Sequence, residues 1–150
     1  MRIDDAIKTK SFVSEYHRLR VNMLYSAHWL EGEIKIVLDP FGVSQKQFNI
    51  LRILRGHNGK VDMSILDLKD RMIVASSDVS RMVERMEKKG LVKRKPCTED
   101  KRVTRVKVSD QGLELLASID SEKHKLDAML HNLSEEEARV LNVLLDKARG

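Results

Sequence analysis

The chain has 150 residues and a formal net charge of +5, and 34% of its residues are charged while only 4% are aromatic. This length suits one domain with its own core, and the composition favours a mostly helical protein over a β-sandwich. Its single cysteine, Cys97, excludes an internal disulfide and fits a reducing compartment. Neither a signal peptide nor a run of about 18 apolar residues is found, so we expect a cytoplasmic protein with no membrane partner.

The positive charge is concentrated in one segment. Residues 81–107 hold eleven Lys or Arg and four Asp or Glu, a net charge of +7. The rest of the chain carries 17 bases and 19 acids, a net charge of −2. A merely solvated surface would scatter the excess, so this distribution indicates a local binding surface for a polyanion.

The first predicted helix begins at Ser11 as its cap, and its apolar residues recur every three or four positions as far as Ile34. A stripe of that length with no partner close in sequence is expected to pack against another long helix. The Asp-Pro-Phe-Gly sequence at 39–42 ends it.

Three shorter helices are predicted next. Ser44 and Gln47 form a capping box that begins the first of them. The second covers residues 63–72, and the third covers 76–89 and ends at Gly90.

Two short strands, 91–95 and 103–108, follow and are joined by a turn at 96–100. A long helix is expected over 109–131 and a final one over 135–149, the latter opened by a capping box of Ser134 and Glu137. Three short helices followed by a hairpin predict a winged helix, within a fold that is mainly α with a small β-hairpin.

The helix at 76–89 has the residues to read DNA. At about 100° per residue, its apolar side chains fall in one sector and form the predicted buried face: Val79, Met82, Val83 and Met86. The opposite face and its flanks carry Ser77, Ser80, Arg81, Glu84, Arg85 and Lys88. Exposed Ser and Arg near a helix N-terminus suit a major groove, because Arg can donate two hydrogen bonds to guanine and the N-terminus favours phosphate. Alone, the pattern fits an ordinary amphipathic surface helix equally well.

The hairpin favours the DNA-binding interpretation, because both of its strands bring cations to one tip. Lys93, Arg94 and Lys95 precede the turn, and Lys101 and Arg102 follow it. Arg105 and Lys107 are expected on one side of the second strand, opposite Val106 and Val108. Such a tip can reach phosphates, and an arginine there can enter a narrow minor groove. Glu99 and Asp100 are unsuited to contact DNA; we expect Asp100 to turn the loop and pair with a nearby arginine.

Four parts of the chain carry a family pattern: VSRMVERMEKKGLV at 79–92, Glu-Asp-Lys-Arg at 99–102 followed by Val-Lys-Val-Ser at 106–109 and Gly112, Phe-Gly-Val-Ser at 41–44, and Leu-Ser-Glu-Glu-Glu at 133–137. They resemble the MarR family of bacterial regulators, the first its recognition helix and first wing strand and the second its wing. The similarity spans roughly residues 12–147. It implies a homodimeric winged-helix protein that binds pseudo-palindromic operators on double-stranded DNA, usually as a repressor released by a small molecule.

The resemblance also implies an organisation and a set of site residues. Within a single domain, 1–150, residues 44–108 would form the DNA-binding lobe, and residues 1–38 and 109–150 the dimerisation helices. Ser77, Ser80, Arg81 and Arg85 match the helix positions that face the groove, and Arg102 matches the wing arginine that enters the minor groove. Together with the neighbouring polar and charged residues of the helix and hairpin, the expected DNA-binding set is Ser76, Ser77, Asp78, Ser80, Arg81, Arg85, Lys88, Lys95, Lys101, Arg102 and Arg105. The family often has Ser at Ala75 and Thr at Asp78; Asp78 either stabilises the first helical turn or accepts a bond from cytosine N4.

Other kinds of site have little support in the sequence. The five histidines lack metal-ligand spacing, so we expect no metal site. Cys97 in the wing turn is interpreted as incidental, although basic neighbours can lower a thiol pKa and favour redox chemistry. By analogy with the family, an effector pocket would involve His17, Trp29 and Phe48. No catalytic triad, phosphate loop or paired-carboxylate motif occurs, so we expect neither an enzyme nor a cofactor.

Two alternatives to a sequence-specific regulator remain open at this point. One is a winged-helix protein-interaction module that has lost DNA binding and uses its basic segment to contact an acidic partner. The other is an architectural DNA-binding protein with no sequence preference.

Overall fold

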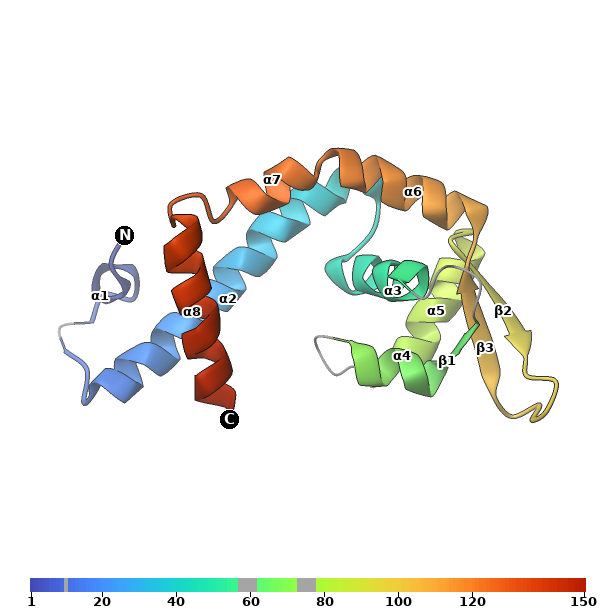
Figure 1. Cartoon of the computed structure of the whole chain (residues 1–150), viewed down its shortest axis with the longest axis horizontal. Helices are drawn as coiled ribbons and strands as arrows, with labels where there is room; N and C mark the ends of the chain where they lie inside the picture. The colour runs from blue at the N-terminus through green and yellow to red at the C-terminus, as the bar shows by residue number, and fades with distance from the viewer. Residues whose placement is uncertain (10, 57–61, 73–77) are drawn as a thin grey trace. The chain divides into compact units, whose positions relative to one another are not determined.

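The computed structural model describes residues 1–9, 11–56, 62–72 and 78–150 (Figure 1). Its elements are α1 (Ile3–Ala6), α2 (Glu15–Leu38), the 3-10 helix η1 (Asp39–Phe41), α3 (Gln45–Gly56), β1 (Met63–Ser64), α4 (Ile65–Arg71), α5 (Val79–Lys88), β2 (Val92–Pro96), β3 (Thr104–Val108), α6 (Asp110–Ser121), α7 (Lys123–Ala128) and α8 (Glu135–Arg149). None of the described helices is both long enough and apolar enough to cross a membrane.

The chain divides into two compact units. The first comprises Met1–Ile36 and Ala128–Gly150, and the second comprises Val37–Asp127. This division groups α6 with α3, α4, α5 and the three strands.

The second unit is a winged helix, as predicted. Helices α3, α4 and α5 pack together, and α5 packs on β2. The strands form an antiparallel sheet in the order β1-β3-β2, in which Val106 of β3 lies opposite Met63 on one side and Arg94 on the other. The loop that joins β2 to β3 lies at the end of the hairpin remote from α6 (Figure 1).

The hydrophobic core lies in this second unit, where each of its helices α3 to α6 and each strand contributes a buried apolar residue. Its largest fully buried side chains are Leu38, Ile50, Leu51, Leu54, Leu68, Val79, Val83, Met86, Val92, Val106, Leu116 and Ile119. In the first unit, by contrast, Ile3 is the one buried apolar side chain among the described residues. The winged helix therefore has a core of its own, whereas many large apolar side chains on the described helices of the first unit are exposed.

Two expectations about individual helices are wrong. Residues 63–72 are not one helix, because Met63 and Ser64 form a strand that pairs with β3 before α4 begins. The helix expected over 109–131 is interrupted at Glu122, which separates α6 from α7. Strand pairing across the sheet overrides local helical preference in the first case.

The start of the long N-terminal helix also differs from expectation. It begins at Glu15, and the Ser14 hydroxyl, not that of Ser11, accepts a hydrogen bond from the His17 amide at 3.1 Å. Both predicted capping boxes are confirmed: the Ser44 hydroxyl accepts from the Gln47 amide, and the Ser134 hydroxyl accepts from the Glu137 amide.

The hairpin is joined to α6 by a close backbone approach. Gly90 has a φ of +74° where the chain turns from α5 into β2, a conformation that favours glycine. The buried Ser109 caps α6, accepting from the Gly112 amide at 3.0 Å while its hydroxyl donates to the Gly90 carbonyl. A Cβ atom on Gly112 would lie 2.2 Å from the Leu91 carbonyl oxygen and 2.9 Å from Val108 Cγ2.

This approach predicts that Gly112→Ala destabilises the protein, although the same change within a helix normally stabilises it by up to about 1 kcal/mol. Overpacking against backbone should lower the free energy of unfolding by about 1–3 kcal/mol. Gly32→Ala in α2 is the matched control, because no atom lies within 4 Å of its Cβ position. Urea unfolding of both variants measures the difference, and equal stabilisation by both would contradict the close approach.

Candidate nucleic-acid interface

Helix α5 has the two faces that its sequence predicted. Val79, Met82, Val83 and Met86 are all buried. Ser80, Arg81, Arg85 and Lys88 are exposed, with 83% of the Arg81 side chain and 62% of the Arg85 side chain accessible to solvent. Since packing fixes the rotation of the helix, one face of α5 is available to a partner. Ser76 and Ser77 lie outside the described residues.

Asp78 lies at the N-cap position of α5 but makes no side-chain capping hydrogen bond. Its carboxylate instead faces two arginines of the exposed face, 3.8 Å from Arg81 Nε and 3.6 Å from an Arg85 guanidinium nitrogen. Exposed pairs of this kind contribute little to stability, about 0–1 kcal/mol. Their consequence is local: a negative charge is held beside two cations of the exposed face of α5.

The turn of the hairpin is shaped by Asp100. Its carboxylate accepts a hydrogen bond from the backbone amide of Arg102 at 2.9 Å, and its carbonyl accepts from the amide of Val103 at 2.9 Å. Asp100 therefore turns the loop as predicted. The predicted ion pair to an arginine is not found among the described residues; Asp100 holds Arg102 through its backbone instead.

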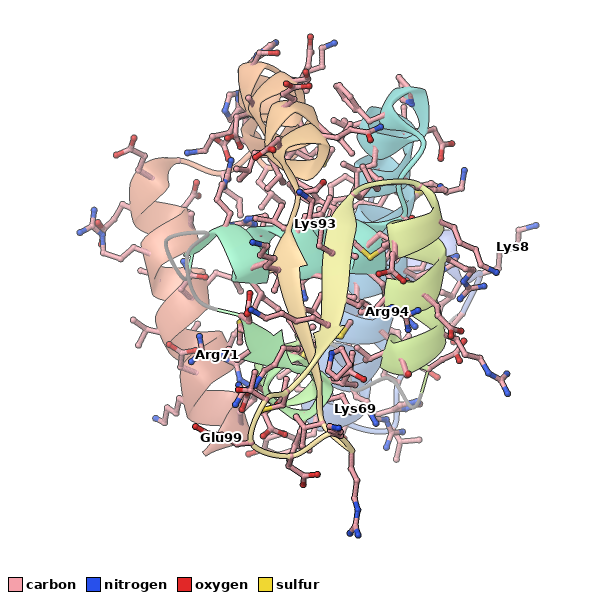
Figure 2. All side chains as sticks on the ribbon, turned by 90° about the vertical axis from the view of Figure 1, so that its right-hand side faces the viewer. Lys8, Lys69, Arg71, Lys93, Arg94 and Glu99 are labelled. Carbon is pink, nitrogen blue, oxygen red and sulfur yellow. The ribbon has the colours of Figure 1, made fainter. Side chains whose placement is uncertain are left out.

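The loop presents free cations. Lys101 and Arg102 are exposed, and neither forms an ion pair within the described ranges. Glu99 lies on the same loop (Figure 2). The guanidinium of Arg102 remains available to an anion, because Asp100 holds only its backbone.

Two of the expected DNA-binding cations on the strands are already paired. Lys95 of β2 forms an ion pair with Asp62, and a guanidinium nitrogen of Arg105 in β3 lies 4.0 Å from the Asp67 carboxylate in α4. No local sequence signal identifies Asp62 and Asp67 as partners, since each is far from its cation in the chain. The expected DNA-binding cations thus fall into a free group, with Lys88, Lys101 and Arg102, and a paired group.

The Cys97 thiol has a different environment from that expected. Backbone amides of Asp100 and Glu99, and then the Arg105 guanidinium, form hydrogen bonds that hold the pKa of Cys97 below its ordinary value. Basic neighbours were the expected cause, but the backbone donors of the turn are the larger one. The thiolate fraction at neutral pH is therefore greater than that of an ordinary cysteine.

The residues suggested for an effector pocket do not line either of two clefts found in the described chain. One cleft, of about 360 Å³, lies between α1 and α2, and the other, of about 370 Å³, lies among the end of η1, the turn that follows α5, and α6. His17 forms an edge-to-face contact with Phe12, and Phe48 is buried under Arg52. Among the described residues, no group of three or more His, Cys, Asp or Glu could hold a metal ion.

The thiol environment predicts faster alkylation of Cys97 in the native protein than in the unfolded chain at neutral pH. Arg105→Gln should raise the pKa of Cys97 and move the midpoint of the rate–pH curve upward, because a cation that favours the thiolate is lost. Lys107→Gln, on the same strand, is the control and should leave the midpoint unchanged. Iodoacetamide kinetics are specific because the chain has one cysteine. A midpoint in the native protein equal to that in urea would contradict the assigned hydrogen bonds.

Several known proteins with a similar sequence or fold are transcription regulators. Residues 43–104 match the MarR family. The chain is 34% identical over 145 residues to YdgJ of Bacillus subtilis (strain 168), an uncharacterised HTH-type transcriptional regulator, covering 93% of this chain and 82% of the relative.

Solved structures of transcription regulators share the fold of this chain. The organohalide-sensing regulator RdhR-CbdbA1625, solved with 2,4-dichlorophenol, superposes with a TM-score of 0.82 at 25% identity, covering 91% of this chain and 80% of that one. A MarR mutant from E. coli, solved with operator DNA, has the same fold, with a TM-score of 0.81 at 23% identity and coverage of 93% and 99%. The chain therefore belongs to the MarR family, whose members are transcription regulators and not enzymes.

Proposed function

We propose that this regulator binds double-stranded DNA sequence-specifically, with α5 in the major groove and the hairpin loop at the adjacent minor groove. One observation carries the proposal. The exposed arginines of α5 and the free cations of the loop belong to one compact unit, whose core fixes the opposite face of α5. The structure of E. coli MarR with operator DNA supports this mode of binding by its fold.

Each part of this surface has a distinct chemical task. Arg81 and Arg85 can donate paired hydrogen bonds to guanine, and Ser80 can bond to a base or a phosphate. Arg102, on a loop, suits the negative potential of a narrow minor groove. Lys88 and Lys101 can neutralise phosphates and thereby set affinity and its salt dependence without reading sequence.

Asp78 adds selectivity to this surface. A carboxylate at the start of α5 repels phosphate but accepts a hydrogen bond from the exocyclic amine of cytosine. Because it also faces Arg81 and Arg85, it restrains the two arginines when no matching base is present. We expect the operator to differ at this position from those of relatives with threonine there.

The functional form is a homodimer, and helix α8 supplies the argument. None of its 15 residues is buried, and four apolar side chains are 44–62% exposed: Val140, Leu141, Val143 and Leu144. Apolar residues of α2, among them Tyr16, Leu19 and Leu24, are also at least half exposed. A second copy of the chain would cover such faces.

A two-fold dimer would present two α5 helices to successive major grooves about 34 Å apart, which matches a pseudo-palindromic operator. Occupying such a site across a promoter makes the protein a repressor. The dichlorophenol bound to RdhR-CbdbA1625 supports release by a small molecule. His17, Trp29 and Phe48 stay candidates for contacts to that effector.

The direct test is binding, at two salt concentrations, to labelled DNA from the region upstream of the gene that encodes this chain. We expect a specific mobility shift that weakens steeply with salt, because each neutralised phosphate releases counterions. No shift at low salt, even with a fragment library, would refute DNA binding and favour a protein-interaction module. Equal affinity for random DNA would identify an architectural binder. Selection from random duplexes then yields the operator.

Arg102→Ala should lower operator affinity by roughly ten- to a hundredfold, the loss of one good groove contact. Folding and dimerisation should be unaffected, because the Arg102 side chain is exposed. Lys46→Ala removes one positive charge from the exposed surface of α3 and serves as the control. Binding isotherms measure both variants; wild-type affinity in Arg102→Ala would show that the wing is wrongly assigned.

Leu144→Glu should convert the dimer to a folded monomer, because it introduces a charge where an apolar face would be covered. Asn142→Glu adds the same charge on the opposite side of α8 and should leave the dimer intact. Sedimentation equilibrium distinguishes the monomer mass of 17.3 kDa from twice that value. A wild-type protein of monomer mass at micromolar concentration would refute the dimer.

A further inference from the structure

Arg94 lies within the positive segment but does not face outward with its neighbours. Lys93 and Lys95 are exposed, whereas only 28% of the Arg94 side chain is accessible. Figure 2 shows Arg94 between strand β2 and helix α5. Its charge is therefore directed at the recognition helix and not at an external ligand.

Two glutamates of α5 receive this side chain. Arg94 Nε donates to Glu87 Oε2 at 2.6 Å, and a terminal guanidinium nitrogen lies 3.5 Å from Glu84 Oε1. Glu87 Oε1 also accepts from the backbone amide of Arg94 at 3.1 Å. One carboxylate thus bonds both the main chain and the side chain of a strand residue. The bond from the Arg94 guanidinium lowers the pKa of Glu87, which stays ionised at neutral pH.

These contacts connect the middle of β2 to α5, beyond the turn that joins the two elements. Gly90 turns the chain between α5 and β2, so the covalent connection alone fixes only the start of the strand. Arg94 is in the middle of β2, opposite Val106 of β3. Because β2 is an edge strand, its Arg94 amide can be held from the helix side without disturbing the pairing to β3.

We infer that the Glu87–Arg94 contact, supported by Glu84, holds the wing in the position relative to α5 that lets both engage DNA together. Arg94 is thus a positioning residue and not a DNA ligand. The inference rests on the proposed DNA binding. It explains why an arginine in the most basic part of the chain is only partly exposed, and why two acids occur on a helix that would face a polyanion.

The inference and simple electrostatics predict opposite effects for Glu87→Ala. Removing an acid raises the net positive charge, which alone would strengthen DNA binding. Loss of positioning should instead weaken operator binding about tenfold, the ratio expected for one charge-assisted hydrogen bond. Glu114→Ala on α6 makes the same change of charge, outside the Arg94 contact, and should bind no more weakly than the wild type.

A salt series distinguishes positioning from direct contact. If Arg94 only positions the wing, Glu87→Ala and Arg94→Ala both lose affinity with the wild-type slope of log K against log salt, and the double variant loses no more than the worse single one. If Arg94 itself binds a phosphate, Arg94→Ala lowers the slope by about 0.9 and the two losses add. Additive losses, a reduced slope, or wild-type affinity in Glu87→Ala would overturn the inference.

Hydrogen exchange in the absence of DNA gives an independent measurement. The Arg94 amide should exchange faster in Glu87→Ala than in the wild type, while core amides of α3 keep their protection and show that the variant is folded. Unchanged exchange at Arg94 would also count against the contact. Binding of the wild-type protein to the selected operator is the reference. If the wild-type protein does not bind, the proposed DNA binding itself is wrong. If it binds and Glu87→Ala binds equally well, only the role of Glu87 and Arg94 is rejected.

Discussion

The buried apolar face of α5 is the constraint on which the rest of the winged helix depends. Each of Val79, Met82, Val83 and Met86 gains about 1.5–3 kcal/mol by leaving water, and all four leave it together only in one rotation of the helix. That rotation turns Arg81 outward. The orientation of the exposed face is therefore a consequence of the core, and a change in the core can alter the proposed DNA contacts without replacing an exposed residue.

The hairpin takes its position from the same helix. Gly90 redirects the chain, Ser109 binds the Gly90 carbonyl, and the backbone at Leu91 leaves no room for a side chain on Gly112. These contacts anchor the end of the hairpin near α6, and the Glu87 carboxylate holds it farther along β2. The loop that carries Arg102 thus lies at the far end of a hairpin that is anchored at two points.

Local signals in the sequence predicted what local interactions determine. Both capping boxes, the glycine turn at Gly90 and the apolar face of α5 were predictable, because each is encoded within a few residues. The strand at Met63 was not, since two residues show no period and their partner, Val106, lies far along the chain. The break at Glu122 has no glycine or proline to mark it. The residues 73–77, with the expected Ser76 and Ser77, lie outside what the structure describes.

The candidate site shows the same limit in its electrostatics. The net charge of residues 81–107 identifies the basic segment but does not show which of its cations are paired with carboxylates. Asp62, Asp67 and Asp78, all outside residues 81–107, lie against cations within it and offset three of its seven excess charges. Six cations of the segment have no carboxylate partner among the described residues: Lys88, Lys89, Lys93, Lys101, Arg102 and Lys107. In the proposed function, these free cations would attract DNA through its phosphates. The arginines paired with Asp78 would stay near that carboxylate until a base offered better hydrogen bonds, and this difference between attraction and reading is what sequence specificity requires.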